Sequence, residues 1–451
     1  MTHSLMYQKR KFTEGKMFIL SEEKKLDFSP ADLSEPWFRI DNASNLYAAA
    51  RNKKWCRTYR TCLVLDHEID KAVMQRALTD TAKRFPSMCG RLKDGLFWSY
   101  FERTDEAPVL CDDVNYPYRP IEIEGNNQPN FRISVYKNRV AMEVFHSLSD
   151  GSGTNLFLAT LTGRYFELMG EDIPKSELVL DVNEKARACE VEDSYFANRD
   201  PKYSAKNVSQ PDVYLTENEP EENYIRLHHG LFRVEDVKKA AKKYSLTITE
   251  YLTAAIIYMF IKCEKEPINK PLSVSVPIDL RKRFNSFSVR NFVYMTDVSF
   301  NPCGRKDVEF TEICASIKGK LAERASQDYL VSCISANVAA QSSKLLKPIP
   351  NIFKRVFLKN SYKKSQQSYT TFFSNLGELP LPPEISKHVL RAESCLGSTP
   401  HMHFGCASVS INGLFNFTFC TGNHDLEKQK FFFRFLASDG VPVRVESNIW
   451  E

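Results

Sequence analysis

Two alternating segments followed by a glycine-rich turn constrain the first half of this chain most strongly. Phe131–Tyr136 and Val140–His146 alternate around the turn Lys137-Asn138-Arg139, which predicts a β-hairpin. The turn Asp150-Gly151-Ser152-Gly153 comes next, and a helical pattern follows it. The apolar positions of that helix are Leu158, Leu161, Tyr165 and Leu168. Residues 146–150 therefore lie at the junction of a strand and a helix.

The rest of the chain also mixes strands with helices and has no short repeat. A strand over 57–65 and a helix over 70–84 precede the hairpin, and Asn412-Gly413 predicts a further tight hairpin near the C-terminus. In the second half, the helix that begins at Thr247 has Glu250 three residues later, as in a capping box. Residues 170–223 are polar and lack periodicity, as expected of a segment that crosses between two halves.

We therefore predict an α/β protein with two halves, each a mixed open sheet with helices. The first half covers residues 1–190, a crossing linker covers 191–223, and the second half covers 224–451. The length of 451 residues suits two or three domains.

The composition is that of a folded protein and excludes several classes. Apolar residues make up 43% and charged residues 26%, and the net charge of +5 is too small to suggest a nucleic-acid partner. The most apolar stretch, Ile248 to Cys263, is too short to cross a membrane and contains Glu250 and Lys262. The basic N-terminus has no apolar run behind it, and the twelve cysteines form no Cys-x-x-Cys. We expect a cytoplasmic, monomeric protein with reduced thiols.

Motifs for metals and nucleotides are missing from the sequence. There is no His-Glu-x-x-His, no Gly-x-x-x-x-Gly-Lys-Ser/Thr and no Gly-x-Gly-x-x-Gly, so zinc hydrolases, P-loop enzymes and dinucleotide enzymes all become poor candidates. His401-Met402-His403 has no third ligand nearby, and His228-His229 is expected on a strand surface. We predict no metal and no bound cofactor.

The residues best suited to chemistry are in the segment His146-Ser147-Leu148-Ser149-Asp150-Gly151. A histidine at a strand end can act as a general base, because its ordinary pKa is close to neutral pH. Asp150 can accept backbone amide hydrogen bonds and pair with an arginine, and Gly151 permits a tight turn. A lone histidine at a strand end is, however, more often a structural core residue.

Two further segments place polar groups at strand ends. Val276-Pro277-Ile278-Asp279-Leu280-Arg281 ends a strand with an arginine, and Phe373-Ser374-Asn375-Leu376-Gly377 ends another with groups that can contact an oxyanion. Capping a turn is the commoner role of an asparagine such as Asn375.

The order of these motifs resembles the CoA-dependent acyltransferase superfamily, which includes chloramphenicol acetyltransferase and the condensation domains of peptide synthetases. His-x-x-x-Asp-Gly comes first, Val-Pro-Ile-Asp-Leu-Arg with Val-Arg-Asn-Phe second, and Ser-Asn-Leu-Gly third, across residues 146–377. Bacterial alcohol acetyltransferase and condensation-like proteins are the nearest in pattern.

The resemblance implies an active-site tunnel between two halves, with His146 as general base, Asp150 as structural aspartate and Arg281 as its salt-bridge partner. His146 would deprotonate an alcohol or amine that attacks an acyl-CoA thioester, with no covalent intermediate and with acyl-CoA as co-substrate. Two departures stand out. Phe145 replaces the first histidine of the doubled pair in condensation domains, and the Asp-Phe-Gly-Trp-Gly of the plant enzymes is missing, which leaves the oxyanion donor open. A condensation-type enzyme that uses carrier-protein thioesters and a non-catalytic binding module therefore remain as alternatives.

A basic stretch lies just before the third motif. Residues 329–377 contain no Asp or Glu. They contain the basic residues Lys344, Lys347, Lys354, Arg355, Lys359, Lys363 and Lys364. A solvated face is the ordinary interpretation, and docks for CoA phosphates, an acidic acyl carrier protein or an anionic membrane surface are the functional ones. We predict that Lys354, Arg355 and Lys359 bind the CoA phosphates, with Ser374 in the substrate site.

Overall fold

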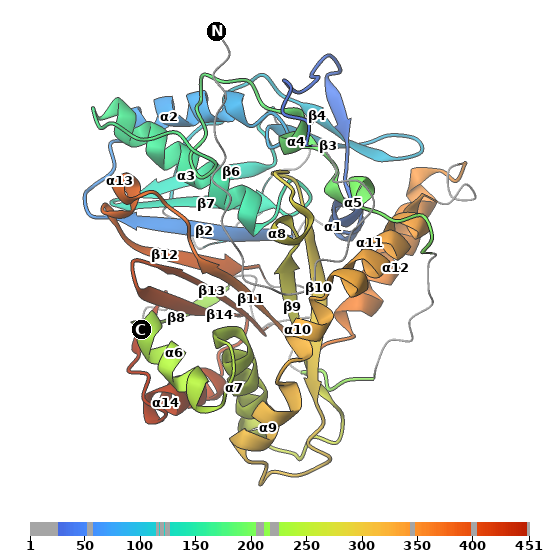
Figure 1. The fold of residues 1–451 in the computed structure, drawn as a ribbon, viewed down its shortest axis with the longest axis vertical. Helices are drawn as coiled ribbons and strands as arrows, with labels where there is room; N and C mark the ends of the chain where they lie inside the picture. The colour runs from blue at the N-terminus through green and yellow to red at the C-terminus, as the bar shows by residue number, and fades with distance from the viewer. Residues whose placement is uncertain are drawn as a thin grey trace, which may run out of the picture.

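A computed structural model gives the fold of this chain (Figure 1). It describes residues 26–51, 57–113, 117, 121, 127–203, 212–216, 225–342, 348–397 and 404–448. His401, His403, Lys344 and Lys347 lie outside these described residues.

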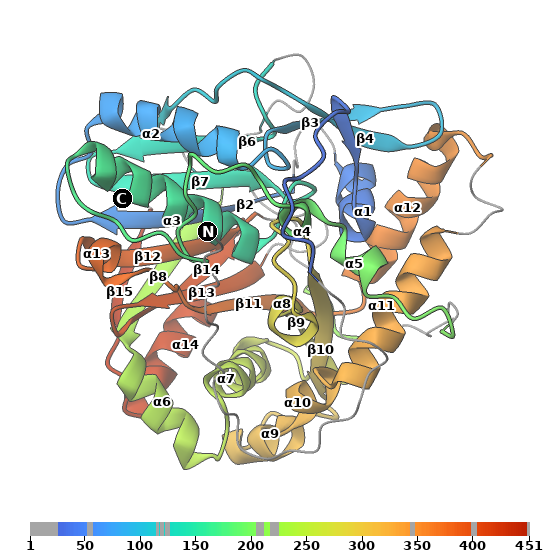
Figure 2. The same cartoon turned by 45° about the horizontal axis from the view of Figure 1, so that its top comes forward.

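The first large sheet has five strands in the order β12-β2-β7-β6-β5. Its strands are β2 (Thr58–Leu65), β5 (Cys111–Asp112), β6 (Phe131–Tyr136), β7 (Arg139–Phe145) and β12 (Val389–Leu396). β5 and β6 are parallel and the other pairs are antiparallel. The helices α2 (Lys71–Arg84) and α3 (Gly151–Leu168) cover one face of this sheet (Figure 2). The predicted hairpin and the helix after it are therefore present.

The second large sheet has seven strands in the order β10-β9-β11-β13-β14-β8-β15. Its strands are β8 (Arg226–Arg233), β9 (Leu272–Asp279), β10 (Val293–Phe300), β11 (Thr371–Glu378), β13 (Phe404–Ile411), β14 (Leu414–Thr421) and β15 (Arg444–Ser447). β11 is parallel to both β9 and β13, so this sheet is mixed as well. The turn between β13 and β14 has positive φ at Asn412 and Gly413, as the Asn-Gly pair predicted.

Four helices of the second half contribute to one large core. The core helices are α6 (Val234–Lys243), α7 (Ile248–Cys263), α9 (Phe310–Ile317) and α14 (Glu427–Ser438). Thr247 and Glu250 form the predicted capping box of α7. The remaining helices are α8 (Arg281–Phe284), α10 (Lys320–Arg324), α11 (Gln327–Gln341), α12 (Asn351–Gln366) and α13 (Pro383–Ser386). Among the described residues, no single helix is long and apolar enough to span a membrane, and the pair α6 and α7 passes by length and composition only, with a bend of 75°.

Strand β12 connects the two halves. It belongs to residues 224–451 in sequence but pairs along its length with β2 of the first sheet. The same strand packs against β13 and β14 of the second sheet, so β12 joins the two sheets (Figure 1). The division of the chain at residues 191–223 therefore stays a prediction, while the fold itself is a two-part mixed α/β fold as expected.

The remaining elements extend the first half. A small third sheet has the order β1-β4-β3, with β1 (Trp37–Arg39), β3 (Gly90–Asp94) and β4 (Ser99–Arg103). The other helices are α1 (Asn42–Ala50), α4 (Ala188–Val191) and α5 (Ser194–Ala197). The crossing segment is anchored where Glu190 makes a buried two-pronged ion pair with Arg84 at the end of α2.

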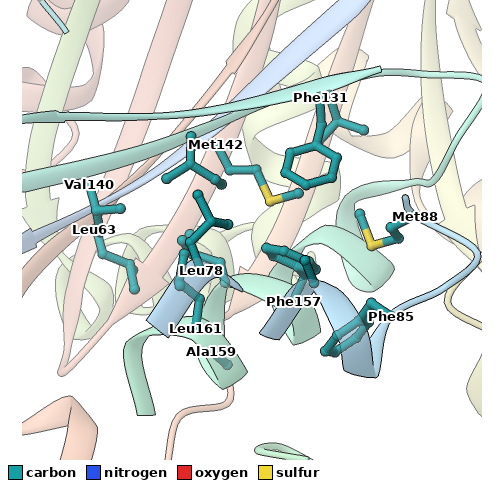
Figure 3. Close-up of a cluster of buried hydrophobic side chains, with 14 of the residues drawn as sticks. Leu63, Leu78, Phe85, Met88, Phe131, Val140, Met142, Phe157, Ala159 and Leu161 are labelled. Carbon is teal, nitrogen blue, oxygen red and sulfur yellow. The ribbon is translucent and has the colours of Figure 1, made fainter. Parts of the chain in front are cut away.

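The first core lies between the five-stranded sheet and α2 and α3. Figure 3 shows Met142 and Phe131 from the sheet facing Leu78 of α2 and Phe157 of α3. These side chains are fully or almost fully buried. The last residue of β7, Phe145, is fully buried in this core. The strand therefore fixes the position of His146, the next residue along the chain.

The expectation for His228 and His229 was wrong. Both side chains are buried in β8, and His229 hydrogen bonds with Thr418 of β14 at 3.0 Å. The reason is that β8 is an interior strand, paired with β14 on one edge and β15 on the other, and that α6 packs against it.

Candidate active site

The loop from β7 to α3 holds the best candidate catalytic residue in a fixed position. The backbone N–H of His146 donates to the carbonyl of Arg57 at 2.9 Å, which continues the pairing of β7 with β2. Asn291 donates from Nδ2 to the His146 carbonyl at 2.9 Å. Ser44 donates to the carbonyl of Ser147 at 2.5 Å, and Ser149 donates to that of Val289 at 2.6 Å. The loop is therefore tied to the first half and to residues 289–291 of the second.

Asp150 and Arg281 form the centre of this connection. Asp150 is the N-cap of α3 and accepts from the N–H of Gly153 at 3.1 Å. Its carboxylate also accepts the Phe292 N–H at 2.7 Å and both terminal nitrogens of Arg281, at 2.9 and 3.0 Å. Burial lowers the pKa of the Arg281 guanidinium, but the carboxylates of Asp150 and Asp279 outweigh burial and raise it. The carboxylate is thus used for structure and the guanidinium stays charged.

The imidazole of His146 lies between two tyrosine rings. Tyr47 of α1 stacks on it with ring centroids 4.2 Å apart and planes 14° apart. Tyr59 of β2 lies on it at 4.7 Å with a tilt of 57°, and its hydroxyl pairs with Thr154 of α3 at 2.5 Å. Nδ1 of His146 is buried and makes no hydrogen bond with any part of the chain that the structure describes. The residue as a whole is only partly buried, and its ring is held by the two tyrosines.

Burial sets the protonation state of this histidine. It lowers the pKa of His146 below its ordinary value, and the nearby Asp150 carboxylate only partly offsets that effect. Burial also raises the pKa values of Tyr47 and Tyr59, so both phenols stay neutral. At neutral pH the site therefore presents an uncharged imidazole, the form that can accept a proton.

The two glycines of the turn have different surroundings. A Cβ at Gly151 would lie 2.6 Å from the flexible end of Leu376 in β11. A Cβ at Gly153 would lie 2.1 Å from the carbonyl oxygen of Val289, which is backbone and cannot move aside. The start of α3 thus packs against β11 at Gly151 and against residue 289 at Gly153. Gly153 has less room for a side chain than Gly151.

The third motif, Ser374 to Gly377, lies close to the start of α3, but the side chain of Asn375 already hydrogen bonds within the protein. Asn375 donates from Nδ2 to Thr249 at 2.9 Å, and its Oδ1 accepts from the Gly377 N–H and from Ser408, both at 3.0 Å. The bond to Gly377 is the turn-capping role considered from the sequence. Ser374 is half-buried on β11. An oxyanion contact from Asn375 and a substrate contact from Ser374 stay predictions.

The predicted CoA-phosphate residues lie on α12. Lys354 donates to the carbonyl of Phe97 at 2.9 Å, and Arg355 pairs with Asp94 at 2.5 Å. Both partners belong to the β3–β4 hairpin. Lys359 is exposed. Their role in binding acyl-CoA stays a prediction.

Sequence reasoning missed the residues that hold His146. Tyr47 comes from a helix that no pattern predicted, and Tyr59 looked like an ordinary strand residue. Arg57 also lies beside the site, with positive φ and with its guanidinium 4.7 Å from the ring of Tyr362 on α12. Asn291 is part of the second motif, but the sequence did not indicate its role. In the structure it donates a hydrogen bond to the His146 carbonyl and so holds the loop.

One group of potential metal ligands lies among the described residues. Asp66, His67 and His388 bring ligand atoms within 4.8 Å of one another. Asp66 and His67 follow the last residue of β2, whereas His146 hydrogen bonds with Arg57, just before the first residue of β2. The two groups therefore lie at opposite ends of this strand. The carboxylate of Asp66 pairs with both imidazoles, at 2.6 and 3.1 Å. We assign this group no part in the candidate active site.

Solved structures resemble the fold of this chain over most of its length. F. graminearum TRI101, solved with coenzyme A and T-2 mycotoxin, has a TM-score of 0.61 at 9% identity, with 90% of this chain and 99% of that chain covered. The first condensation domain of the CDA synthetase has a TM-score of 0.59 at 14% identity, with the same two coverages. The chain therefore shares its fold with TRI101 and with this condensation domain.

A third likeness extends slightly further along the chain. TRI3 trichothecene 15-O-acetyltransferase from Fusarium sporotrichioides has a TM-score of 0.56 at 12% identity, covering 94% of this chain and 99% of that one. The sequence matches no protein-family model and no curated protein. The fold expected from the three motifs is therefore confirmed by these structures. At identities of 9% to 14%, the likeness shows the fold alone.

Proposed function

We propose that this protein is an acyltransferase that moves an acyl group from acyl-CoA to an alcohol or amine, with His146 as general base. The observation that carries the proposal is the environment of His146. Its imidazole is held between Tyr47 and Tyr59 and is neutral at neutral pH. The carboxylate four residues later is committed to Arg281, so it fixes the loop and leaves the imidazole free to take a proton.

The reaction needs one proton carrier and no covalent enzyme intermediate. The neutral imidazole takes the proton of the acceptor's hydroxyl or amine as that oxygen or nitrogen attacks the thioester carbonyl. The resulting oxyanion collapses, the carbon–sulfur bond breaks, and the imidazolium returns the proton to the CoA sulfur. His146 is therefore neutral again at the end of each turnover.

The likeness to TRI101 and TRI3 supports this class of reaction. TRI101 was solved with coenzyme A, and TRI3 is described as an O-acetyltransferase. The likeness to a condensation domain favours a second candidate, a free-standing enzyme that uses carrier-protein thioesters. Phe145 argues against it, because this side chain is fully buried in the core and cannot supply a second histidine-like group to the site.

Mass spectrometry of reaction products tests the proposal. The purified protein would be incubated with a panel of acyl-CoAs and of alcohols and amines. We expect a product heavier by the acyl group together with free CoA. A reaction seen only with acyl groups loaded on a carrier protein would support the second candidate. Donors that all stay intact while ligands bind would point to a non-catalytic module and contradict both.

A further inference from the structure

Helix α12 exposes an unusual number of large apolar side chains. Ile352, Phe353, Val356 and Phe357 in its first two turns have exposed fractions between 59% and 70%. Leu96 and Trp98 of the β3–β4 turn are exposed by 72% and 55%. The turn adjoins the helix, because the N–H of Asn351 donates to the carbonyl of Leu96 at 2.7 Å. We call these six residues the α12 patch. Adjoining exposed apolar residues of this kind mark an interaction surface.

The same face of the helix becomes basic in its later turns. With 100° per residue, Lys363 and Lys364 fall within the angular sector that holds the apolar residues, and Lys359 lies at its edge. All three lysines are exposed. Residues 329–377 contain no acidic residue, and Asp94, which contacts α12, is paired with both Arg51 and Arg355. The exposed face is thus apolar at one end and positively charged at the other.

The helix is firmly held by its other face. Lys354 and Arg355 bind the β3–β4 hairpin, and α12 packs along α1 (Figure 2). Tyr362 lies with its ring 6.3 Å from that of Tyr47, which stacks on His146. The helix is therefore already packed through its other face, and its apolar residues stay exposed in the folded protein. Tyr362, on that packed face, contacts Tyr47 beside the candidate active site.

We propose that the α12 patch and its lysines dock this protein on an anionic lipid bilayer. Large apolar side chains enter the boundary between headgroups and acyl chains, where tryptophan is also favoured. Each lysine near an anionic surface adds attraction that salt weakens. An acidic protein would match the lysines equally well, but the exposed phenylalanine, isoleucine and tryptophan side chains beside them suit a bilayer better. Docking would bring an acceptor dissolved in the membrane close to His146.

Vesicle co-sedimentation tests this proposal on the full-length protein. The vesicles would contain phosphatidylcholine alone, or phosphatidylcholine with phosphatidylglycerol. We expect binding to the anionic vesicles, at least tenfold weaker binding to the neutral ones, and a decrease with added salt. Phe353→Ser with Phe357→Ser, and separately Lys363→Gln with Lys364→Gln, should each weaken binding to anionic vesicles by about tenfold or more.

Matched controls come from other exposed positions. Leu390→Ser with Val445→Ser removes exposed apolar groups elsewhere, and Lys238→Gln with Lys239→Gln removes exposed lysines of α6. Both controls should bind vesicles like the wild type, and circular dichroism would verify folding of every variant. Acyl transfer to a soluble acceptor should not change in Phe353→Ser with Phe357→Ser.

Three results would overturn the proposal. One is a wild-type protein that does not bind anionic vesicles. Another is a loss of vesicle binding in the controls as large as that in the patch variants. The third is a Michaelis constant for acyl-CoA, or an affinity for an acidic carrier protein, that changes in the patch variants while vesicle binding stays the same. Vesicle binding does not require turnover. The docking proposal can therefore be confirmed or rejected even if the protein shows no acyl transfer.

Discussion

Asp150 and Arg281 are 131 residues apart in sequence and meet in a two-pronged ion pair at the start of α3. Arg281 also donates to the carbonyls of Ser288 and Arg290, at 2.7 and 2.6 Å. One arginine of the second half therefore binds the N-cap of a first-half helix and the chain that runs toward β10. The position of His146 depends on this connection, because its loop ends at Asp150.

Breaking this pair should cost stability and activity together. Asp150→Asn or Arg281→Ala removes one partner of a buried charge pair, which typically costs about 3–5 kcal/mol. The double variant should cost clearly less than the sum, with a coupling of about 1–3 kcal/mol. Urea unfolding of the four proteins measures this cycle. Strictly additive losses would show that the two side chains do not act as a pair.

The turn before α3 should accept a methyl group at one glycine and reject it at the other. Gly153→Ala forces a methyl against the carbonyl of Val289 and should cost about 3 kcal/mol. Gly151→Ala meets only the end of Leu376, which can turn away, and should cost less than about 1 kcal/mol. Thermal unfolding compares the two variants directly. Equal losses would contradict the described approach of α3 to residue 289.

Tyr47 should act as a positioning residue through its stack on His146. Tyr47→Phe keeps the ring and should keep most of the activity. Tyr47→Ala lets water reach the imidazole, so turnover should fall about tenfold and the pKa of His146 should rise toward its ordinary value. The acid limb of the pH profile should then move to higher pH. An unchanged pH profile in Tyr47→Ala would leave Tyr47 a purely structural residue.

The pH dependence of the wild type follows from the lowered pKa of His146. The neutral imidazole is the active form, and burial places its pKa below the ordinary value of about 6.5. The kcat/KM should therefore be constant through neutral pH and fall only as the pH drops below about 6.5. Initial rates in buffers of constant ionic strength measure this limb. A limb centred above pH 7 would mean that the essential base is another group or that His146 is not buried in solution.

The sequence was informative wherever periodicity and local motifs act over short distances. The hairpin of β6 and β7, the helix α3 and the capping box of α7 each depend on residues within a few turns of one another. The family resemblance seen in the three motifs implied that Asp150 pairs with Arg281, and the two side chains do form that ion pair.

Contacts between distant segments could not be read in the same way. Tyr47 reaches His146 from a short helix that no sequence pattern indicates, and β12 pairs with β2, a strand more than 300 positions earlier. His228 and His229 looked exposed because alternation along one strand does not reveal a second covering layer. For α12 the mixture of apolar and basic residues made an interfacial helix possible, but the sequence could not tell whether those apolar side chains point outward or into a core.

The turnover of His146→Ala tests the central claim most directly. The hydrogen bonds from His146 to Arg57 and Asn291 use its backbone, which alanine keeps, so the variant should fold with an unchanged circular dichroism spectrum. With an acyl-CoA and acceptor that the wild type uses, turnover should fall about 10²–10⁴-fold, the usual contribution of a positioned general base. A folded His146→Ala that keeps more than about a third of wild-type turnover would contradict the assignment of His146 as the catalytic base.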